Sequence, residues 1–268
     1  MLQQTQVSSV IPYYKNFLKQ FPSLKRLADA PVDAVLACWS GLGYYARARN
    51  LHKAAAIIRK DYRGRFPVNI DALESLPGIG RSTAGAILAL SKQSRHPILD
   101  GNVKRVLCRY YTVAGWSGES KVMEKLWHYA EINTPDNNIR QYTQAIMDLG
   151  ATVCTRSQPQ CSLCPFRSGC GAYRNGQVTR YPYAKPKKIL PIKQTQMLML
   201  EDKQKNVLLL KRPDSGIWGG LWSFPECGPD DDAIDWCQQH LGLQVEHTVT
   251  LAEFKHTFSH YQLQITPV

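Results

Sequence analysis

Four cysteines that could bind a metal lie within seventeen residues: Cys154, Cys161, Cys164 and Cys170, separated by six, two and five residues. Thiolates this close repel one another unless a cation lies between them, and they select soft metals such as zinc or iron–sulfur clusters. Zinc sites usually use two short Cys-x2-4-Cys pairs, and this run has one. The spacing therefore favours a [4Fe-4S] cluster over zinc. Disulfides or unligated thiols are disfavoured, because nothing else indicates an oxidising compartment.

A glycine turn precedes this run, in Leu76-Pro-Gly-Ile-Gly-Arg-Ser-Thr-Ala-Gly-Ala-Ile-Leu88. Pro77 ends one helix, Gly78 and Gly80 permit positive φ, and a second helix starts at Arg81, which predicts a helix-hairpin-helix. Such a turn directs backbone amides and a helix N-terminus at one point and suits a DNA phosphate. A plain turn between packed helices is the alternative. The motif indicates DNA binding rather than a reaction.

An acidic residue that could take part in a reaction is Asp100, which follows an apolar pair and precedes a basic helix, within Ile98-Leu-Asp-Gly-Asn-Val-Lys-Arg105. A carboxylate at a helix N-terminus is stabilised in its charged form by the helix dipole. Alone, such an Asp is more often a plain helix cap. Its position eighteen residues after Ser82, with the cysteine run following, favours a functional role.

The elements that must position these residues follow from charge and composition. Residues 1–194 carry 28 Lys and Arg against 11 Asp and Glu, a net charge of +17, whereas residues 195–268 have a net charge of −5. The sequence contains no apolar run long enough to span a bilayer, so no membrane partner is expected. An excess of this size predicts a polyanionic partner, DNA or RNA, and a basic surface kept for solubility is the alternative.

The chain pattern predicts two domains. Residues 1–176 read as short amphipathic helices, with Ser23 capping one, Pro31 opening another and Pro97 closing a third, and with the metal loop at 154–170. The proline- and cation-rich residues 177–194 predict an extended linker. Residues 195–268 predict a partial α+β domain, with strands at 195–200, 207–211, near Phe254 and at 262–265.

The hairpin, Asp100 and the cysteine run together resemble the helix-hairpin-helix DNA glycosylase superfamily that contains endonuclease III. The resemblance is closest to the MutY adenine DNA glycosylases, and it runs from end to end. It includes Met1-Leu-Gln-Gln-Thr-Gln-Val7, Gly41-Leu-Gly-Tyr-Tyr-Ala-Arg-Ala-Arg-Asn50 and Met147-Asp-Leu-Gly-Ala151.

The resemblance implies an enzyme with a [4Fe-4S] cluster that removes adenine mispaired with 8-oxoguanine or guanine by hydrolysing the N-glycosidic bond. Asp100 would stabilise the sugar cation and Asn102 would orient that centre. Gln3, Gln4 and Tyr44 would enter the base stack as the adenine is flipped out.

Lyase relatives carry a lysine nucleophile where this chain has Ser82, and without an amine no Schiff base forms there. The resemblance therefore implies a simple glycosylase, with Lys104 as a nearby amine that could form an imine adventitiously. Gly78, Gly80, Ser82 and Lys104 are expected to lie at the DNA.

The family also carries a general-acid glutamate two residues before the methionine that aligns with Met1, and adenine is a poor leaving group without protonation. We therefore expect the chain to be cut at its N-terminus and inactive as it stands. It also ends at Val268 just after a predicted strand, so we expect a cut at the C-terminus as well. A lyase acting on oxidised pyrimidines and a non-catalytic mismatch-binding protein remain alternatives.

The second domain resembles the MutT (Nudix) fold, but Trp236-Cys-Gln-Gln-His240 stands where the magnesium-binding glutamates would lie, so phosphohydrolase chemistry is not expected. Phe258, Ser259 and His260 resemble the family's lesion-reading loop, and an ordinary strand end is the alternative. The resemblance implies a monomer that binds double-stranded DNA in the bacterial cytoplasm, at the nucleoid, with targeting left open.

Overall fold

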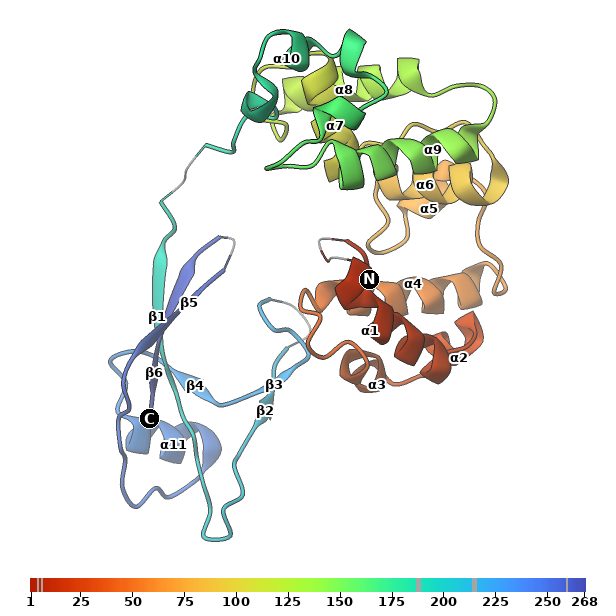
Figure 1. The fold of residues 1–268 in the computed structure, drawn as a ribbon. Coiled ribbons are helices and arrows are strands. Elements are labelled where there is room, and N and C mark those ends of the chain that lie inside the picture. The colour runs from red at the N-terminus through yellow and green to blue at the C-terminus, as the bar shows by residue number, and fades with distance from the viewer. Residues whose placement is uncertain (4, 6, 187–188, 214–215, 259) are drawn as a thin grey trace. The chain divides into compact units, whose positions relative to one another are not determined.

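A computed structural model describes residues 1–3, 5, 7–186, 189–213, 216–258 and 260–268. The chain forms two compact units, Met1–Pro186 and Lys187–Val268. Their boundary falls inside the stretch 177–194, where the composition predicts a linker. Figure 1 shows that the first unit is built of helices and that the strands belong to the second.

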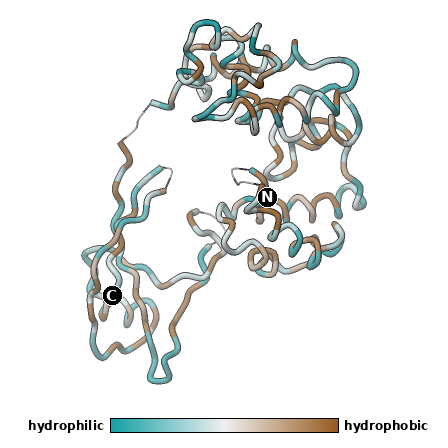
Figure 2. Tube along the Cα trace, viewed as in Figure 1, coloured by the Kyte–Doolittle hydropathy of each residue, from teal (hydrophilic) through white to brown (hydrophobic). Residues whose placement is uncertain are grey.

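The first unit is mainly α, as predicted. Its α-helices are α1 (Val7–Gln20), α2 (Leu24–Asp29), α3 (Val32–Ala37), α4 (Ala46–Asp61), α5 (Ile70–Glu74), α6 (Arg81–Lys92), α7 (Gly101–Tyr110), α8 (Ser120–Asn133), α9 (Ile139–Asp148) and α10 (Gly171–Arg174). Shorter turns are the π-helix η1 (Leu149–Val153) and the 3-10 helices η2 (Cys161–Leu163), η3 (Arg167–Gly169) and η4 (Val178–Arg180). In Figure 2 apolar and polar residues alternate along these helices, as amphipathic packing requires.

Helix ends follow the local sequence in most places. The Ser23 hydroxyl accepts a hydrogen bond from Arg26 N at 3.2 Å and caps α2, and Pro31 precedes α3. The prediction that Pro97 closes a helix is wrong. Helix α6 ends at Lys92, because Gln93 adopts a left-handed conformation with φ 54°.

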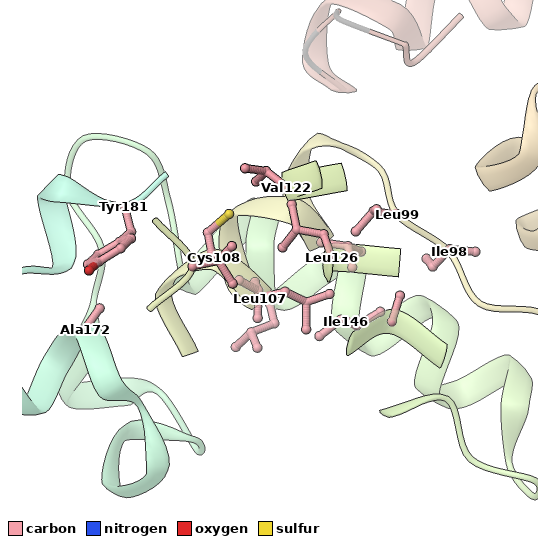
Figure 3. Packing of buried hydrophobic residues seen from close by; sticks show 14 residues of the cluster. Ile98, Leu99, Leu107, Cys108, Val122, Leu126, Ile146, Ala172 and Tyr181 are labelled. Atoms are coloured by element: carbon pink, nitrogen blue, oxygen red, sulfur yellow. The ribbon is translucent and has the colours of Figure 1, made fainter. Parts of the chain in front are cut away.

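The main core of the first unit lies among α7, α8 and α9, where Leu107, Leu126 and Ile146 pack together (Figure 3). Tyr181 belongs to the same cluster. The first part of the stretch predicted as a linker is therefore packed. Burial of an aromatic ring there outweighs the extended tendency of its proline-rich sequence.

The second unit is α+β. Its strands are β1 (Ile192–Met197), β2 (Leu210–Lys211), β3 (Trp222–Ser223), β4 (Glu226–Cys227), β5 (Phe254–Thr257) and β6 (Gln262–Pro267), with the helix α11 (Ala233–Leu241). One sheet has the order β4-β1-β6-β5, in which β1 runs parallel to β6, and β2 pairs with β3 alone.

Two strand predictions need correction. The first strand spans 192–197 rather than 195–200. Of the stretch predicted as a strand at 207–211, Val207 forms an isolated bridge with Glu201, and Leu210–Lys211 form β2, which pairs with β3 rather than with β1. The reason is that β1 already pairs with β6 on one edge and with β4 on the other. Among the described residues, no helix is long and apolar enough to cross a membrane.

Candidate active site and nucleic-acid interface

The hairpin forms between α5 and α6 as predicted, but its two glycines differ. Gly78 has φ +79°, and a Cβ there would lie 2.9 Å from the Cβ of Asn50, so this position requires glycine. Gly80 is extended, with φ −95°, so it does not use the positive φ that a glycine permits. A Cβ at Gly80 would meet no described atom within 4 Å. The surface at Gly80, where α6 begins, is therefore open to a ligand.

Ser82 joins the hairpin to the segment that carries Asp100. Its Oγ accepts a hydrogen bond from Leu99 N at 2.9 Å. Seventeen residues of chain thus close into a loop that brings the first turn of α6 beside the residue before Asp100. The structure brings the two strongest candidate sites of the sequence together.

Asp100 occupies the N-cap of α7, where its Oδ1 accepts a hydrogen bond from Val103 N at 2.8 Å. The side chain is half-buried, and one carboxylate oxygen is thereby held in place at the N-terminal end of the helix. Lys104 follows one turn later, where its backbone N donates to Asp100 O at 2.9 Å. The residues Asp100, Asn102 and Lys104 therefore share the first turns of one helix.

Arg105 is a site residue that the sequence reasoning missed. Its Nη2 donates to Asn102 Oδ1 at 2.8 Å and to Gly150 O at 2.6 Å, and its Nε donates to Cys154 O at 2.7 Å. This guanidinium fixes the Asn102 amide and links it to the first cysteine of the metal loop. The sequence does not single out Arg105, because it lies in a basic segment next to Lys104, and only its contacts in the structure distinguish it from an exposed cation.

Gly150 explains why this packing is so close. A Cβ at that position would lie 2.6 Å from the Cβ of Asn102. The π-helix η1 can therefore approach α7 at Asn102 only with glycine at this point.

All four predicted ligands line one cavity, together with Arg109, Arg167 and Tyr173. Burial raises the pKa of the Cys161 thiol, and the neighbouring thiols of Cys154, Cys170 and Cys164 raise it further. Among the residues that the structure describes, no three His, Cys, Asp or Glu side chains converge as ligands of a single metal ion. Four thiols that line one cavity provide the kind of donor set that binds soft metals.

Arg109, also absent from the predicted site, supports this loop from α7. The side chain is 2% exposed, and its Nη1 donates to Cys154 Sγ at 3.2 Å and to Thr155 O at 2.7 Å. Its Nε donates to Val178 O and Tyr181 O. One buried guanidinium thus connects a predicted ligand with the segment that follows the metal loop.

Of the residues predicted to enter the base stack as a wedge, Gln3 and Tyr44 lie at exposed turns. Gln3 and Tyr44 are both exposed, and Tyr44 has a left-handed backbone with φ 51°. Arg47 contacts both segments. Gln4 lies outside the described residues.

In the second unit, Phe258 and His260, two of the predicted lesion-reading residues, belong to a cluster of aromatic rings. Phe258 lies 5.2 Å from the ring of Trp218 and 4.5 Å from that of His256, and His260 lies 5.0 Å from Tyr261. Phe258 N donates to Tyr261 O at 2.9 Å, which closes a tight turn. Ser259 lies outside the described residues. Trp218 was not predicted as a site residue, although two Gly-x-Trp triplets, Gly216 to Trp218 and Gly220 to Trp222, mark an unusual turn in its loop.

Two family models match this chain. The model of the HhH-GPD superfamily of base excision DNA repair proteins matches residues 1–131, and that of the NUDIX domain matches residues 196–268.

Solved structures share the fold of the first unit. A thermostable thymine-DNA glycosylase aligns with a TM-score of 0.58 and 26% identity, covering 65% of this chain and 80% of that one. A trapped covalent intermediate of endonuclease III with DNA aligns with a TM-score of 0.57 and 23% identity, covering 65% and 81%. The second likeness concerns the fold alone.

Curated relatives match along the whole chain. An adenine DNA glycosylase of Buchnera aphidicola subsp. Schizaphis graminum is 41% identical over 100% of this chain and 77% of its own length. The adenine DNA glycosylase of Homo sapiens is 32% identical over 98% of this chain and 58% of its own. With its hairpin, Asp100 helix and Nudix unit, the chain belongs to the adenine DNA glycosylase family of base excision repair enzymes, which act on DNA.

Proposed function

We propose that the protein removes adenine mispaired with 8-oxoguanine or guanine, by hydrolysing the N-glycosidic bond without cutting the DNA backbone. The observation that carries this proposal is the hydrogen bond between Ser82 and Leu99, because it brings the hairpin beside Asp100. The hairpin, which can bind phosphate, and the Asp100 carboxylate, which can stabilise a cation, then lie side by side.

The chemical step needs a negative charge beside the sugar. When the bond to adenine breaks, C1′ of the deoxyribose becomes oxocarbenium-like, and a fixed carboxylate stabilises that charge more in the transition state than in the substrate. Asp100 is suited to this role, because Val103 N holds one of its oxygens and leaves the other free to face the sugar. Asn102, oriented by Arg105, would position the sugar or the attacking water.

The hairpin supports a hydrolase rather than a lyase. Ser82 lies at the position where lyases carry their amine, and its hydroxyl oxygen accepts a hydrogen bond from Leu99 N. A lyase forms a Schiff base with the sugar, which requires an amine at the reacting carbon. Lys104 could form one only adventitiously.

A [4Fe-4S] cluster is the group that Cys154, Cys161, Cys164 and Cys170 would hold. Their thiols surround a shared cavity, and a cationic side chain, Arg109, already reaches Cys154 Sγ. When bound, the cluster offsets the thiolate charges and fixes the loop. Zinc is the alternative occupant.

Recognition of the oxidised guanine is assigned to the second unit. Phe258 and His260 would place a ring and a polar group beside the opposite base, with Ser259 as the third member of the triplet. Gln3, Gln4 and Tyr44 would fill the stack that the adenine leaves. Gly78, Gly80 and Lys104 would contact the phosphate backbone. We expect the protein to act as a monomer at the nucleoid.

The test uses protein expressed from the full reading frame and duplexes with one labelled adenine opposite 8-oxoguanine, guanine or thymine. Single-turnover reactions should release free adenine from the first two duplexes and leave the third intact. Strands should break only after alkali treatment, and borohydride should trap little protein on DNA. Release of an oxidised pyrimidine, or efficient trapping, would contradict the proposal.

A further inference from the structure

Arg47, near the start of α4, binds two exposed segments that are more than thirty residues apart in the sequence. Its Nη1 donates to Met1 O at 2.7 Å, to Gln3 O and to Thr5 Oγ1 at 3.1 Å. Its Nη2 donates to Gly43 O at 3.2 Å. One planar guanidinium therefore spans the N-terminal segment and the turn that carries Tyr44.

Ring contacts add to these hydrogen bonds. The guanidinium carbon lies 5.5 Å from the ring of Trp39 and 5.4 Å from that of Tyr44. Trp39 is 1% exposed, and its Nε1 donates to Gly43 O at 3.2 Å, which anchors the turn in the core. Tyr44 is 63% exposed. Arg47 thus connects a buried ring to a ring that points to solvent.

These contacts require arginine. Several acceptors in different directions match the fork of a guanidinium, whereas an ammonium group offers a compact charge that cannot reach both segments. The segments that Arg47 joins are exposed, so the connection adds little buried apolar surface. What it fixes is the position of Gln3 relative to Tyr44.

We propose that Arg47 is a positioning residue that holds Gln3 and Tyr44 as one wedge, so that both enter the base stack at the same step when the adenine is extruded. This inference rests on the proposed function, in which these two residues are the wedge. Insertion of two side chains at one step requires their spacing to be set before DNA binds, because ordering them on the DNA would reduce the extrusion rate.

The experiment measures extrusion directly, with 2-aminopurine replacing the target adenine opposite 8-oxoguanine. Stopped-flow fluorescence is recorded for the wild type and for Arg47→Lys, Tyr44→Ala, Gln3→Ala and the double variant Arg47→Lys/Tyr44→Ala. The reaction temperature lies below the lowest melting temperature of the set. Lys53→Gln is the matched control, since Lys53 is an exposed cation on the same helix.

Arg47→Lys should slow extrusion about 10- to 100-fold, because small misplacements of positioned groups have effects of this size. Its affinity for undamaged duplex and the salt dependence of that affinity should stay unchanged, since the charge is kept. The double variant should be no slower than Tyr44→Ala, because Arg47 acts through the wedge. Lys53→Gln should extrude at the wild-type rate.

Two results would overturn the inference: extrusion by Arg47→Lys at the wild-type rate, or losses that multiply in the double variant. A different result tests the proposed function itself. If Tyr44→Ala and Gln3→Ala both extrude normally while adenine is still released, the wedge is assigned to the wrong residues.

Discussion

At the scale of single residues, three charged side chains take most of their hydrogen-bond partners from the backbone. Asp100 is held by Val103 N, and Arg105 and Arg109 are held by carbonyl oxygens of the metal loop. These bonds hold the side chains in place in the free protein. For Asp100, a negative charge fixed in this way would lower the barrier to forming a sugar cation, as we propose.

The metal loop gives a prediction at this scale. Protein purified without air should be brown and contain about four iron atoms per chain, as a [4Fe-4S] cluster requires. Cys161→Ser should lose iron, whereas Cys38→Ser should keep it, because Cys38 lies outside the cavity. Iron and sulfide analysis decides the matter. Colourless protein with bound zinc would contradict the prediction.

Arg109 gives a second prediction. Arg109→Lys keeps the charge but loses most hydrogen bonds to Cys154, Thr155 and Tyr181. The loop should open more often, so a chelator should remove iron faster, as followed by visible absorbance. Arg174→Lys is the control, because Arg174 is exposed on α10 and does not belong to the lining of the cavity. Equal rates for both variants would contradict this role.

Trp218 gives a third prediction. Its ring packs against Phe258 and His256 in the second unit, so Trp218→Ala should displace the reading residues. Like Phe258→Ala, it should reduce the preference for 8-oxoguanine over guanine opposite adenine and leave affinity for undamaged duplex nearly unchanged. Trp222→Ala is the control, since Trp222 is 60% exposed. Competition binding measures the preference, and an unchanged preference in Trp218→Ala would disprove the support role.

At the scale of elements, sequence reasoning found the hairpin and the Asp100 helix, because glycine, proline and capping residues act locally. Helix α6 starts at Arg81 and α7 starts after Asp100, as predicted. The sequence-based prediction placed β1 three residues too late and missed Arg47, Arg105 and Arg109. Strand pairing and buried guanidinium contacts depend on residues far apart in the chain, which periodicity does not report.

The hairpin glycines provide a matched pair of tests. Gly80→Ala adds a methyl group to open space and should change the melting temperature of the protein by no more than about 2 °C, as surface changes do. It should weaken the binding of the protein to all duplexes alike, because the methyl group would crowd a phosphate. Gly78→Ala should lower the melting temperature as well, because Ala at φ +79° is strained and meets Asn50. A loss restricted to lesion-containing DNA would contradict the phosphate role.

At the scale of the whole molecule, the two parts of the chain differ in the sign of their net charge. Residues 1–194, which contain the whole helical unit, carry a net charge of +17 and the remainder −5, so we expect the phosphate attraction to come mainly from the helical unit. The logarithm of the affinity for undamaged duplex should therefore fall steeply and linearly with the logarithm of the salt concentration. The ratio of lesion to undamaged affinity should change little, because base reading acts at short range. Filter binding over a salt series tests this, and a ratio that falls as steeply as the affinity would contradict it.

The proposed function depends above all on Asp100, which we propose stabilises the sugar cation during adenine release. The most direct measurement is single-turnover excision of adenine opposite 8-oxoguanine by full-length Asp100→Asn, with lesion binding measured on the same duplex. An amide keeps the shape and the bond from Val103 N but loses the charge, so excision should fall about a thousandfold or more while binding is retained. Asp61→Asn, which removes an exposed carboxylate at the end of α4, should leave the rate unchanged. Excision by Asp100→Asn within tenfold of the wild-type rate, with about tenfold corresponding to only 1.4 kcal/mol, would show that another group carries the charge.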